Sequence, residues 1–240
     1  MLNTFSLPFS DDKRMIYAKE YLEEKGYICV DDNSNADFVL LPIPVKDYML
    51  DGLDDKLVFY GMGDYKGRDY NKNESYLLAN AYLTAEGAIA LCKENSDIAI
   101  FGSKVLVTGY GRIAKALCKY LASMGADVTV CSRSESSRVE VLFNNLSHIA
   151  FDVLKRSNDF DFVFNTVPHI VFTKPELSAL KDGAMIIDLA SFPGGVDTLV
   201  ASSKNIKLIN GRGLPSRYSE KTAGFLVGKA VVEIIKGDFS

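Results

Sequence analysis

Residues 104–133 read KVLVTGYGRIAKALCKYLASMGADVTVCSR, and this stretch decides the fold. The apolar run VLVT predicts a buried strand that leads directly into a glycine turn at residues 109–111. Apolar side chains then recur at helical spacing over residues 113–124, and a second strand is expected at residues 128–131. Strand, glycine turn, helix and strand, in this order and length, predict one βαβ half of a dinucleotide-binding fold.

The residue types in the turn fit a bound diphosphate. Gly109 permits the tight bend, and Gly111 has no Cβ, so a diphosphate can approach the backbone closely. The amides at the N-terminus of the following helix point at the anion. Ala114 occupies the third small position, which the motif tolerates. The alternative is a glycine turn that binds no nucleotide. We predict a cofactor-binding turn made of Gly109, Tyr110, Gly111, Arg112 and Ile113.

The end of the second strand favours NADP over NAD. An NAD site usually places a carboxylate about 20 residues after the glycines, to bind the ribose hydroxyls. Here the sequence reads Ser132-Arg133-Ser134, with Arg138 one turn later and no acid before Glu135. A guanidinium pairs with a 2′-phosphate through two donors, and serines can add hydrogen bonds. The alternative is that both arginines are ordinary surface charges and that Glu135 binds the ribose of NAD.

Composition limits the class of protein. The chain has 240 residues, of which 48% are hydrophobic, and a formal net charge of −4 without a basic block. We therefore expect a small-molecule substrate, with neither nucleic acid nor a membrane as partner. Four cysteines without CxxC spacing lie in predicted strands or helices, which is typical of reduced core residues. The N-terminus has no leader pattern, so we expect a cytoplasmic protein; we predict no metal site.

We predict two domains. Residues 1–96 form a smaller N-terminal α/β domain on the substrate side of a cleft, and residues 97–240 form a doubly wound, parallel-sheet Rossmann domain. The last helix, residues 225–235, packs back on one of the domains. In the first domain, Asp11 and Asp12 cap a helix that ends at Gly26. Short strands follow at residues 27–30, 38–41 and 57–60, and an exposed loop at residues 64–73.

Thr84 and Glu86 lie in the stretch NAYLTAEG, which connects the two domains. Thr84 is a good N-cap for a helix that runs to residue 95. The start of a helix favours a bound carboxylate, because its amides are unpaired and the dipole is positive there. Glu86 either complements this dipole or acts in the cleft.

Two further strands of the Rossmann domain end in polar loops. The strand at residues 162–164 leads into Asn165-Thr166-Val167-Pro168, where a nicotinamide ribose would lie in a doubly wound fold. His169 follows, and we interpret it as a surface or capping residue. The strand at residues 184–188 ends at Asp188, which either orients a cofactor or caps the turn. The remaining cofactor contacts are predicted from these loops: Asn165, Thr166, Val167, Pro168, Leu189, Ala190 and Ser191.

A last short strand is predicted at residues 208–209, and three cations cluster after it, namely Arg212, Arg217 and Lys221. An anionic substrate needs such groups near the cleft, and the alternative is that they are solvated loop charges. We predict that Thr84, Arg212 and Lys221 bind an anionic substrate.

The stretches GYGRIAKALCKYLASMGADVTVCSRS, NTVP, IIDLASFPGGVD and GLPSRYSEKTAG together resemble the A subunits of dipicolinate synthase from spore-forming bacteria. The resemblance runs from about Asn80 to the C-terminus. It implies a Rossmann domain that binds NAD(P) beside a smaller α/β domain. It also implies oxidation of dihydrodipicolinate to dipicolinate during sporulation, together with the flavoprotein-like B subunit of the synthase. We expect a homo-oligomer as well.

The sequence departs from the family at several places. Ala114 replaces the usual Gly, Ser216 follows GLP where Gly is usual, and Glu220 precedes Lys221 where Pro is usual. The N-terminal region also reads as shorter by about one leading strand. Most of these departures fall near the substrate loop, so they affect substrate identity more than cofactor binding.

The expected reaction removes a hydride and a proton from a dihydropyridine dicarboxylate, and Glu86 or Lys221 is the predicted catalytic base. Two alternatives remain open. The chain also fits a non-catalytic subunit that binds NADP or serves as a scaffold, because convincing acid and base residues are scarce. It also fits a small reductase similar to shikimate dehydrogenase, on the patterns Ser132-Arg133-Ser134 and Asn165-Thr166.

Overall fold

The structure is a computed structural model that describes residues 2–156, 159–204 and 206–238. The chain forms two compact units: unit 1 is Met1–Leu83 together with Pro215–Ser240, and unit 2 is Thr84–Leu214. Each unit has its own parallel sheet. This arrangement confirms the predicted class, a doubly wound Rossmann domain with a smaller N-terminal α/β domain.

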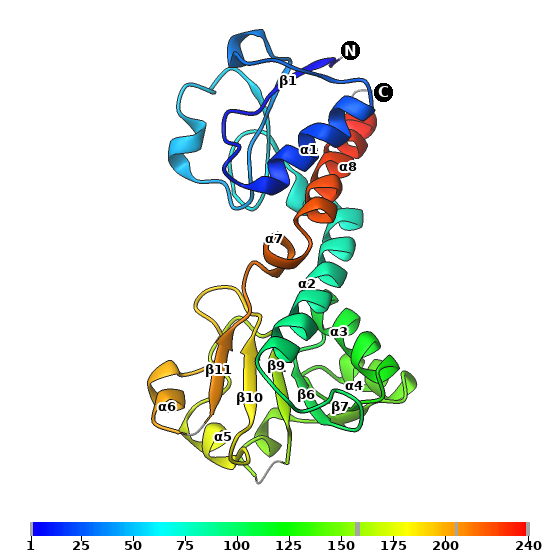
Figure 1. Ribbon diagram of the computed structural model, residues 1–240, viewed down its shortest axis with the longest axis vertical. Coiled ribbons are helices and arrows are strands. Elements are labelled where there is room, and N and C mark those ends of the chain that lie inside the picture. Colours follow the sequence, from blue (N-terminus) through cyan, green and yellow to red (C-terminus); the bar gives the residue numbers. More distant parts are fainter. Residues whose placement is uncertain (1, 157–158, 205, 239–240) are drawn as a thin grey trace. The chain divides into compact units, whose positions relative to one another are not determined.

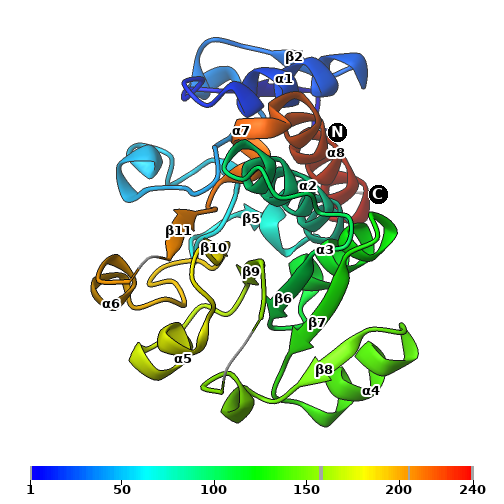
Figure 2. The same cartoon turned by 60° about the horizontal axis from the view of Figure 1, so that its bottom comes forward.

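Unit 2 is built on a six-stranded sheet with the order β11-β10-β9-β6-β7-β8. Every neighbouring pair is parallel. The strand before the glycine turn, β6 (Lys104–Thr108), lies between β7 and β9, where the strand order reverses. Figure 1 shows β11, β10, β9, β6 and β7 side by side, and Figure 2 shows β8 next to β7 and α4. The other strands are β7 (Asp127–Cys131), β8 (Ser147–Ile149), β9 (Phe162–Asn165), β10 (Met185–Asp188) and β11 (Lys207–Asn210).

Both faces of this sheet are buried at its centre. Leu106, Val163 and Ile186 lie in one apolar cluster with Phe172 and Leu177. Val105 and Val107, which flank Leu106 on β6, point to the opposite face of the sheet and are also fully buried. Continuous apolar strands are expected where helices cover both sides of a parallel sheet. The helices of unit 2 are α3 (Arg112–Ser123), α4 (Glu135–Phe143), α5 (Lys174–Ala179) and α6 (Thr198–Ser202).

Unit 1 contains a five-stranded parallel sheet with the order β2-β1-β3-β4-β5. This is the second common order of doubly wound sheets. Three of its strands were predicted, whereas β1 and β5 were missed. The apolar run of β1 is only a few residues long, and β5 lies within residues 64–73, which were predicted to form an exposed loop. The strands are β1 (Thr4–Ser6), β2 (Ile28–Cys29), β3 (Phe38–Leu40), β4 (Leu57–Tyr60) and β5 (Arg68–Asp69).

Two helices from opposite ends of the chain pack together in unit 1. The first, α1 (Lys13–Glu24), begins after Asp12, which accepts a hydrogen bond from the Arg14 amide, as predicted for a cap. The last, α8 (Glu220–Asp238), lies against α1. A Cβ on Gly224 would lie 2.3 Å from the Arg14 carbonyl oxygen, so only glycine allows this approach. The C-terminal helix therefore belongs to the core of unit 1.

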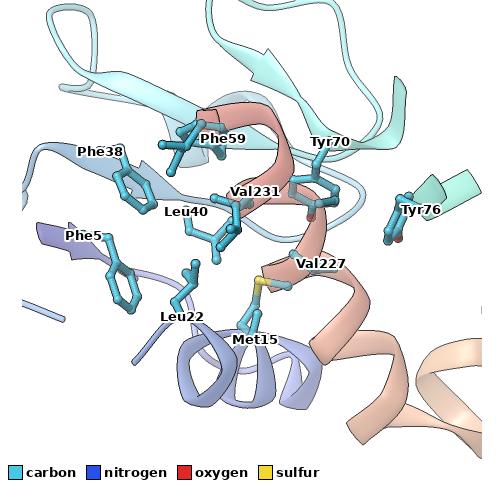
Figure 3. Close-up of a cluster of buried hydrophobic side chains, with 14 residues drawn as sticks. Phe5, Met15, Leu22, Phe38, Leu40, Phe59, Tyr70, Tyr76, Val227 and Val231 are labelled. Carbon is cyan, nitrogen blue, oxygen red and sulfur yellow. The ribbon is translucent and has the colours of Figure 1, made fainter. Parts of the chain in front are cut away.

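The largest apolar cluster of unit 1 joins these helices to the sheet. Figure 3 shows Phe5, Phe38 and Phe59 from three strands together with Met15 of α1 and Val227 of α8. Tyr70 also belongs to this cluster and is fully buried, and its hydroxyl donates to the Leu41 carbonyl at 3.1 Å. The prediction of an exposed loop at residues 64–73 was therefore wrong for Tyr70, because aromatic burial outweighs the charged surroundings of the residue.

A long helix, α2 (Glu74–Glu94), contains the division between the units. Asn73 accepts a hydrogen bond from the Tyr76 amide at 2.8 Å, so the helix starts well before the predicted N-cap. We predicted a domain boundary at residues 96 and 97, whereas the units divide between Leu83 and Thr84. A short helix, α7 (Leu214–Tyr218), follows unit 2. No helix in the described part of the chain is long and apolar enough to cross a membrane.

Candidate functional site

The glycine turn lies at the carboxyl end of β6. Gly109 has a φ of +87°, and a Cβ there would lie 2.4 Å from the Thr166 Oγ1 atom. A side chain is excluded by conformation and by space. Gly111 is the N-cap residue of α3, and a Cβ at this position would meet no atom within 4 Å. The open space before the start of α3 fits a diphosphate. Ala114, in the first turn of α3, is fully buried.

Tyr110 and Lys115 border this turn. The Lys115 ammonium lies 5.3 Å from the centre of the Tyr110 ring and 2.8 Å from a Glu140 carboxylate oxygen. Burial raises the pKa of Tyr110. Arg112 is exposed and Ile113 half-buried at the start of α3. The turn therefore presents its backbone and the cations Arg112 and Lys115 to solvent.

A row of polar side chains crosses three strands at the same edge of the sheet. The strand register pairs Thr108 with Asn165 and Asn165 with Asp188. The Thr108 hydroxyl donates to Asn165 Oδ1 at 2.6 Å, and Asn165 Nδ2 donates to Asp188 Oδ1 at 2.7 Å. Asn165 is fully buried and also binds the backbone of Val167 in both directions. The side-chain amide of Asn165 therefore holds the loop after β9 in place. Its donors and acceptors are used by these contacts, so it has none left for a direct hydrogen bond to a cofactor.

The loops after β9 and β10 are anchored by this row. The Thr166 hydroxyl donates to the Thr108 carbonyl at 2.7 Å, which places Thr166 beside the glycine turn. The Gly195 amide donates to Asp188 Oδ2 at 3.0 Å, and a Cβ on Gly195 would lie 2.0 Å from Asn165 Nδ2. Of the predicted contacts in these loops, Pro168 and Ser191 are exposed, and Val167, Leu189 and Ala190 are mostly buried.

The residues after β7 have different environments. Ser132 is buried, and its Oγ lies 3.0 Å from His148 Nε2. Ser134 caps α4 by accepting from the Ser137 amide at 3.1 Å. Arg133 is exposed, and its guanidinium lies over the Phe151 ring and hydrogen-bonds to His169 Nε2.

Arg138 differs from Arg133 in having a carboxylate partner. Its guanidinium binds both oxygens of Glu135, at 2.8 and 2.5 Å. The hydrogen bonds from Arg138 lower the pKa of Glu135, and those to Glu135 raise the pKa of Arg138. The sequence placed both arginines at the cofactor. Of the two, Arg133 is the one without a carboxylate in ion-pair contact among the residues that the structure describes.

Arg212 lies in the loop after β11. Its Nε donates to the Ala190 carbonyl at 2.7 Å, and its backbone amide donates to Asn210 Oδ1 at 3.0 Å. A Cβ on Gly194 would lie 2.8 Å from the Arg212 Nη2 atom and 2.6 Å from Asp188 Oδ2. Arg212 is therefore held at the same edge of the sheet as the polar row, by neutral acceptors.

The other predicted substrate and catalytic residues belong to two long helices. Thr84 is 8% exposed inside α2, so the predicted N-cap and its carboxylate-binding amides are wrong. Glu86 is exposed on the same helix and accepts a hydrogen bond from the Tyr120 hydroxyl at 3.1 Å; it is too far from the start of the helix to complement its dipole. Lys221 belongs to unit 1, where its ammonium lies over the rings of Tyr17 and Phe225.

Three residues of the site were not assigned from the sequence: Thr108, Gly195 and His169. Thr108 ends an otherwise apolar strand, which is a signal that could have been used. Gly195 and His169 gain their contacts from partners far away in the chain, as the Asn165 and Arg133 contacts show. No sequence spacing reveals such pairs.

Comparisons with known proteins agree with this geometry. Residues 80–191 match the family described as D-isomer specific 2-hydroxyacid dehydrogenase, NAD binding domain. Over 165 residues, 68% of this chain, the sequence is 32% identical to the A subunit of dipicolinate synthase from Bacillus subtilis. The aligned part spans 56% of that relative, so the chain matches about half of its length.

Two solved structures share the fold. The A chain of dipicolinate synthase from Bacillus subtilis matches with a TM-score of 0.86 at 24% identity, over 98% of this chain and 96% of the other. The A subunit of the Bacillus halodurans synthase matches with a TM-score of 0.86 at 21% identity, over 97% of each chain. Residues 80–191 are thus similar to an NAD-binding domain of the dehydrogenase type, and the chain is similar in sequence to the A subunit of dipicolinate synthase.

Proposed function

We propose that this chain is an NADP-dependent oxidoreductase that oxidises dihydrodipicolinate to dipicolinate. The relative named as a dipicolinate synthase suggests the substrate class, and the matched dehydrogenase domain supports an oxidoreductase. The observation that carries the cofactor choice is the environment of Arg133, a cation at the end of β7 without a carboxylate partner among the described residues.

The glycine turn would hold the diphosphate. Gly111 leaves open space in front of α3, and Gly109 fits only as glycine. The amides at the start of α3 would then bind the phosphate oxygens. In this proposal the loops after β9 and β10 border the nicotinamide ribose, through Thr166, Val167, Pro168, Leu189, Ala190 and Ser191. Asn165 holds the first of these loops by its hydrogen bond to the Val167 carbonyl.

The second half of the cofactor decides between NADP and NAD. Glu135 is the first acid after β7, and its carboxylate is bound by Arg138 through two hydrogen bonds. Binding a ribose diol through Glu135 would require breaking this ion pair. Arg133, in contrast, is held by an imidazole and an aromatic ring, neither of which neutralises its charge. This arrangement favours a phosphate on the ribose.

Arg212 is our assignment for a substrate carboxylate. Its side chain is anchored through Nε, and its terminal nitrogens have no hydrogen-bond partner among the described residues. A guanidinium in this state can bind a carboxylate through two donors. Lys221 stays our prediction for a second carboxylate contact, and Glu86 and Lys221 stay our predictions for the base. Thr84 lies inside α2, so no helix start is present there to bind a carboxylate.

The chemistry that the nicotinamide supplies is acceptance of a hydride from the dihydropyridine ring. The ring also loses one proton, to a base or to water, and the product is aromatic. Because aromaticity favours the product, the chain mainly has to position the ring and hold its carboxylates. A cationic Arg212 stabilises the dianionic substrate without taking part in proton transfer.

We also propose that the chain works with a second protein, the flavoprotein-like B subunit of the synthase, because the relative is named as one subunit of an assembly. A role in sporulation, a cytoplasmic location and a homo-oligomeric state belong to the same proposal. Mixing the purified chain with the candidate partner should raise dipicolinate formation if the two act together.

The test is a titration of the purified chain with NADPH and NADH, followed by turnover with NADP⁺ or NAD⁺ as the hydride acceptor. Dihydrodipicolinate is formed in situ with dihydrodipicolinate synthase, and dipicolinate is followed by its absorbance. Tighter binding of NADPH together with dipicolinate formation supports the proposal. Binding without turnover, with and without the candidate partner, contradicts catalysis and favours a scaffold role. Turnover of hydroxy acids instead of dihydrodipicolinate favours the reductase alternative.

Lys221→Ala tests the role of the lysine. We expect it to raise the substrate KM or to abolish turnover, with NADPH affinity unchanged, because Lys221 lies outside unit 2. Lys229→Ala is the matched control on the same helix, since Lys229 is exposed and bears no predicted role. Unchanged turnover in Lys221→Ala would remove this residue from the site.

A further inference from the structure

Both histidines of the chain lie against the two residues that follow β7. His148, on β8, has Nε2 3.0 Å from Ser132 Oγ. His169, in the loop after β9, hydrogen-bonds through Nε2 to the guanidinium of Arg133. The histidines thus border the segment that would contact the adenosine ribose of a dinucleotide.

The contact between Arg133 and His169 fixes the role of each group. A guanidinium has only donors, so Nε2 of His169 accepts the hydrogen bond, and the proton of the neutral ring is on Nδ1. The guanidinium also faces Phe151, whose ring centre lies 5.5 Å away. Arg133 is therefore oriented by two neutral groups.

The pair is open to an anion from solvent. Arg133 and His169 are both exposed. In the described part of the chain no carboxylate is in ion-pair contact with either residue, and the charged group that contacts the imidazole is Arg133 itself. An anion that reaches the guanidinium thus also reaches the imidazole.

We propose that His169 is a specificity-determining residue for a phosphate on the adenosine ribose, an inference that rests on the NADP preference proposed above. In the free protein His169 orients Arg133. When a phosphate takes the donors of Arg133, Nε2 is released, and the imidazole can donate from this nitrogen to the phosphate. A ribose without a phosphate offers no charge to this pair, so NADH gains nothing from it.

The experiment compares His169→Ala and His169→Gln with the wild-type chain. Dissociation constants for NADPH and NADH are measured by nicotinamide fluorescence. Lys174→Gln is the control, because it removes an exposed cation elsewhere on unit 2. Thermal unfolding of each variant shows whether it is folded.

We expect His169→Ala to weaken NADPH binding by about 10- to 100-fold, the effect of one hydrogen bond to a charged group. NADH binding should change by less than about twofold on the same scale. His169→Gln, which keeps a donor and an acceptor, should lose less than the alanine variant.

Two results would overturn the inference alone. A wild-type preference for NADPH that His169→Ala leaves intact rules out a role for His169, while the proposed function stands. Equal weakening of NADPH and NADH in a folded variant indicates that His169 only supports the loop. A wild-type chain that binds NADH as tightly as NADPH overturns both the NADP preference and the role of His169.

Discussion

Arg14 in unit 1 and Arg133 in unit 2 each follow a strand at the carboxyl edge of a parallel sheet, but their partners differ. Asp12 binds Arg14 at 2.6 Å, and the Ile43 carbonyl accepts a further hydrogen bond at 2.7 Å. Burial lowers the pKa of Arg14, but the Asp12 carboxylate outweighs burial, and the net shift is upward. His169 and Phe151 hold Arg133 without any charge.

The difference separates an arginine whose charge is balanced by a carboxylate from one that is held by neutral groups. A guanidinium paired with a carboxylate contributes little net field and joins segments of its own unit. A guanidinium held by neutral groups is oriented but still cationic. Arg212, anchored to the Ala190 carbonyl, belongs to the second kind. In unit 1 the arginine at the edge of the sheet links segments of the same unit through Asp12 and the Ile43 carbonyl. In unit 2, Arg133 and Arg212 lie at the edge of the sheet and are held by neutral groups.

The largest effect is expected from Asp12→Asn. Asparagine can still cap α1, but the Arg14 side chain, only 14% exposed, loses its counter-charge. We expect the free energy of unfolding to fall by about 2–4 kcal/mol, measured by urea denaturation. Asp11→Asn is the control, because Asp11 is exposed and should stay within about 0.5 kcal/mol of wild type. Equal losses in the two variants would mean that Arg14 does not depend on Asp12.

Arg133→Gln tests the other side of the comparison. We expect NADPH binding to weaken by about 10- to 100-fold, because hydrogen bonds from a charged donor are lost, while stability hardly changes. Arg138→Gln is the matched control, since Glu135 already occupies that guanidinium. Fluorescence titration with NADPH and NADH measures both variants. If Arg138→Gln loses as much NADPH affinity as Arg133→Gln, a carboxylate partner does not decide which arginine binds phosphate.

Arg212→Gln should act on the substrate. We expect the KM for dihydrodipicolinate to rise by about tenfold, as one charge-assisted hydrogen bond is weakened, and the NADPH dissociation constant to stay constant. Steady-state kinetics and fluorescence titration check the two values. Arg217→Gln is the control from the same cationic cluster, because the Arg217 guanidinium on α7 stacks on Tyr218. A change in NADPH affinity alone would place Arg212 at the cofactor.

The smallest effect concerns Asp37, a carboxylate that neutral donors hold in unit 1. The amides of Asn3 and Thr4 donate to Oδ2 at 2.7 and 2.8 Å, and these bonds lower the pKa of Asp37. Since the folded pKa is depressed, the stabilisation is present above the unfolded pKa and is lost as the pH falls through the folded value. Asp37→Asn should therefore have a small destabilising effect at neutral pH and none at strongly acidic pH, because solvent screens this exposed site.

Unfolding of wild type and Asp37→Asn across the acidic range measures this dependence. Asp31→Asn serves as the control, because it removes an exposed carboxylate from the same unit. Parallel stability curves for wild type and Asp37→Asn would contradict a role for the two backbone hydrogen bonds. This result would also show that neutral partners do not stabilise the charged form of a group at the surface of unit 1.

Unit 2 was predicted better than unit 1 for a physical reason. The strands of unit 2 are apolar runs that end at glycine or polar residues, and the glycine turn is a local motif. In unit 1, β1 is short, and the burial of Tyr70 depends on α8 from the other end of the chain. Thr84 shows the same limit of local sequence patterns. Its sequence pattern is that of a helix cap, but the residue lies inside α2 and not at the start of the helix.

The candidate site divides in the same way. The ion pair between Glu135 and Arg138 could have been expected, because residues three positions apart face each other on a helix. The contact of Arg133 with His169 joins residues 36 positions apart and could not. Spacing along the chain carries no information on such a pair until the sheet brings the loops together.

The sequence by itself determined the βαβ unit, the glycine turn and the polar ends of the strands, because strand, turn and helix follow from neighbouring residues. The tertiary structure alone decided which groups meet at the edge of the sheet. The register aligns Thr108, Asn165 and Asp188 into one hydrogen-bonded row. The loops then leave Arg133 beside neutral partners, because a net charge depends on what surrounds a residue in space and not on its neighbours in the chain.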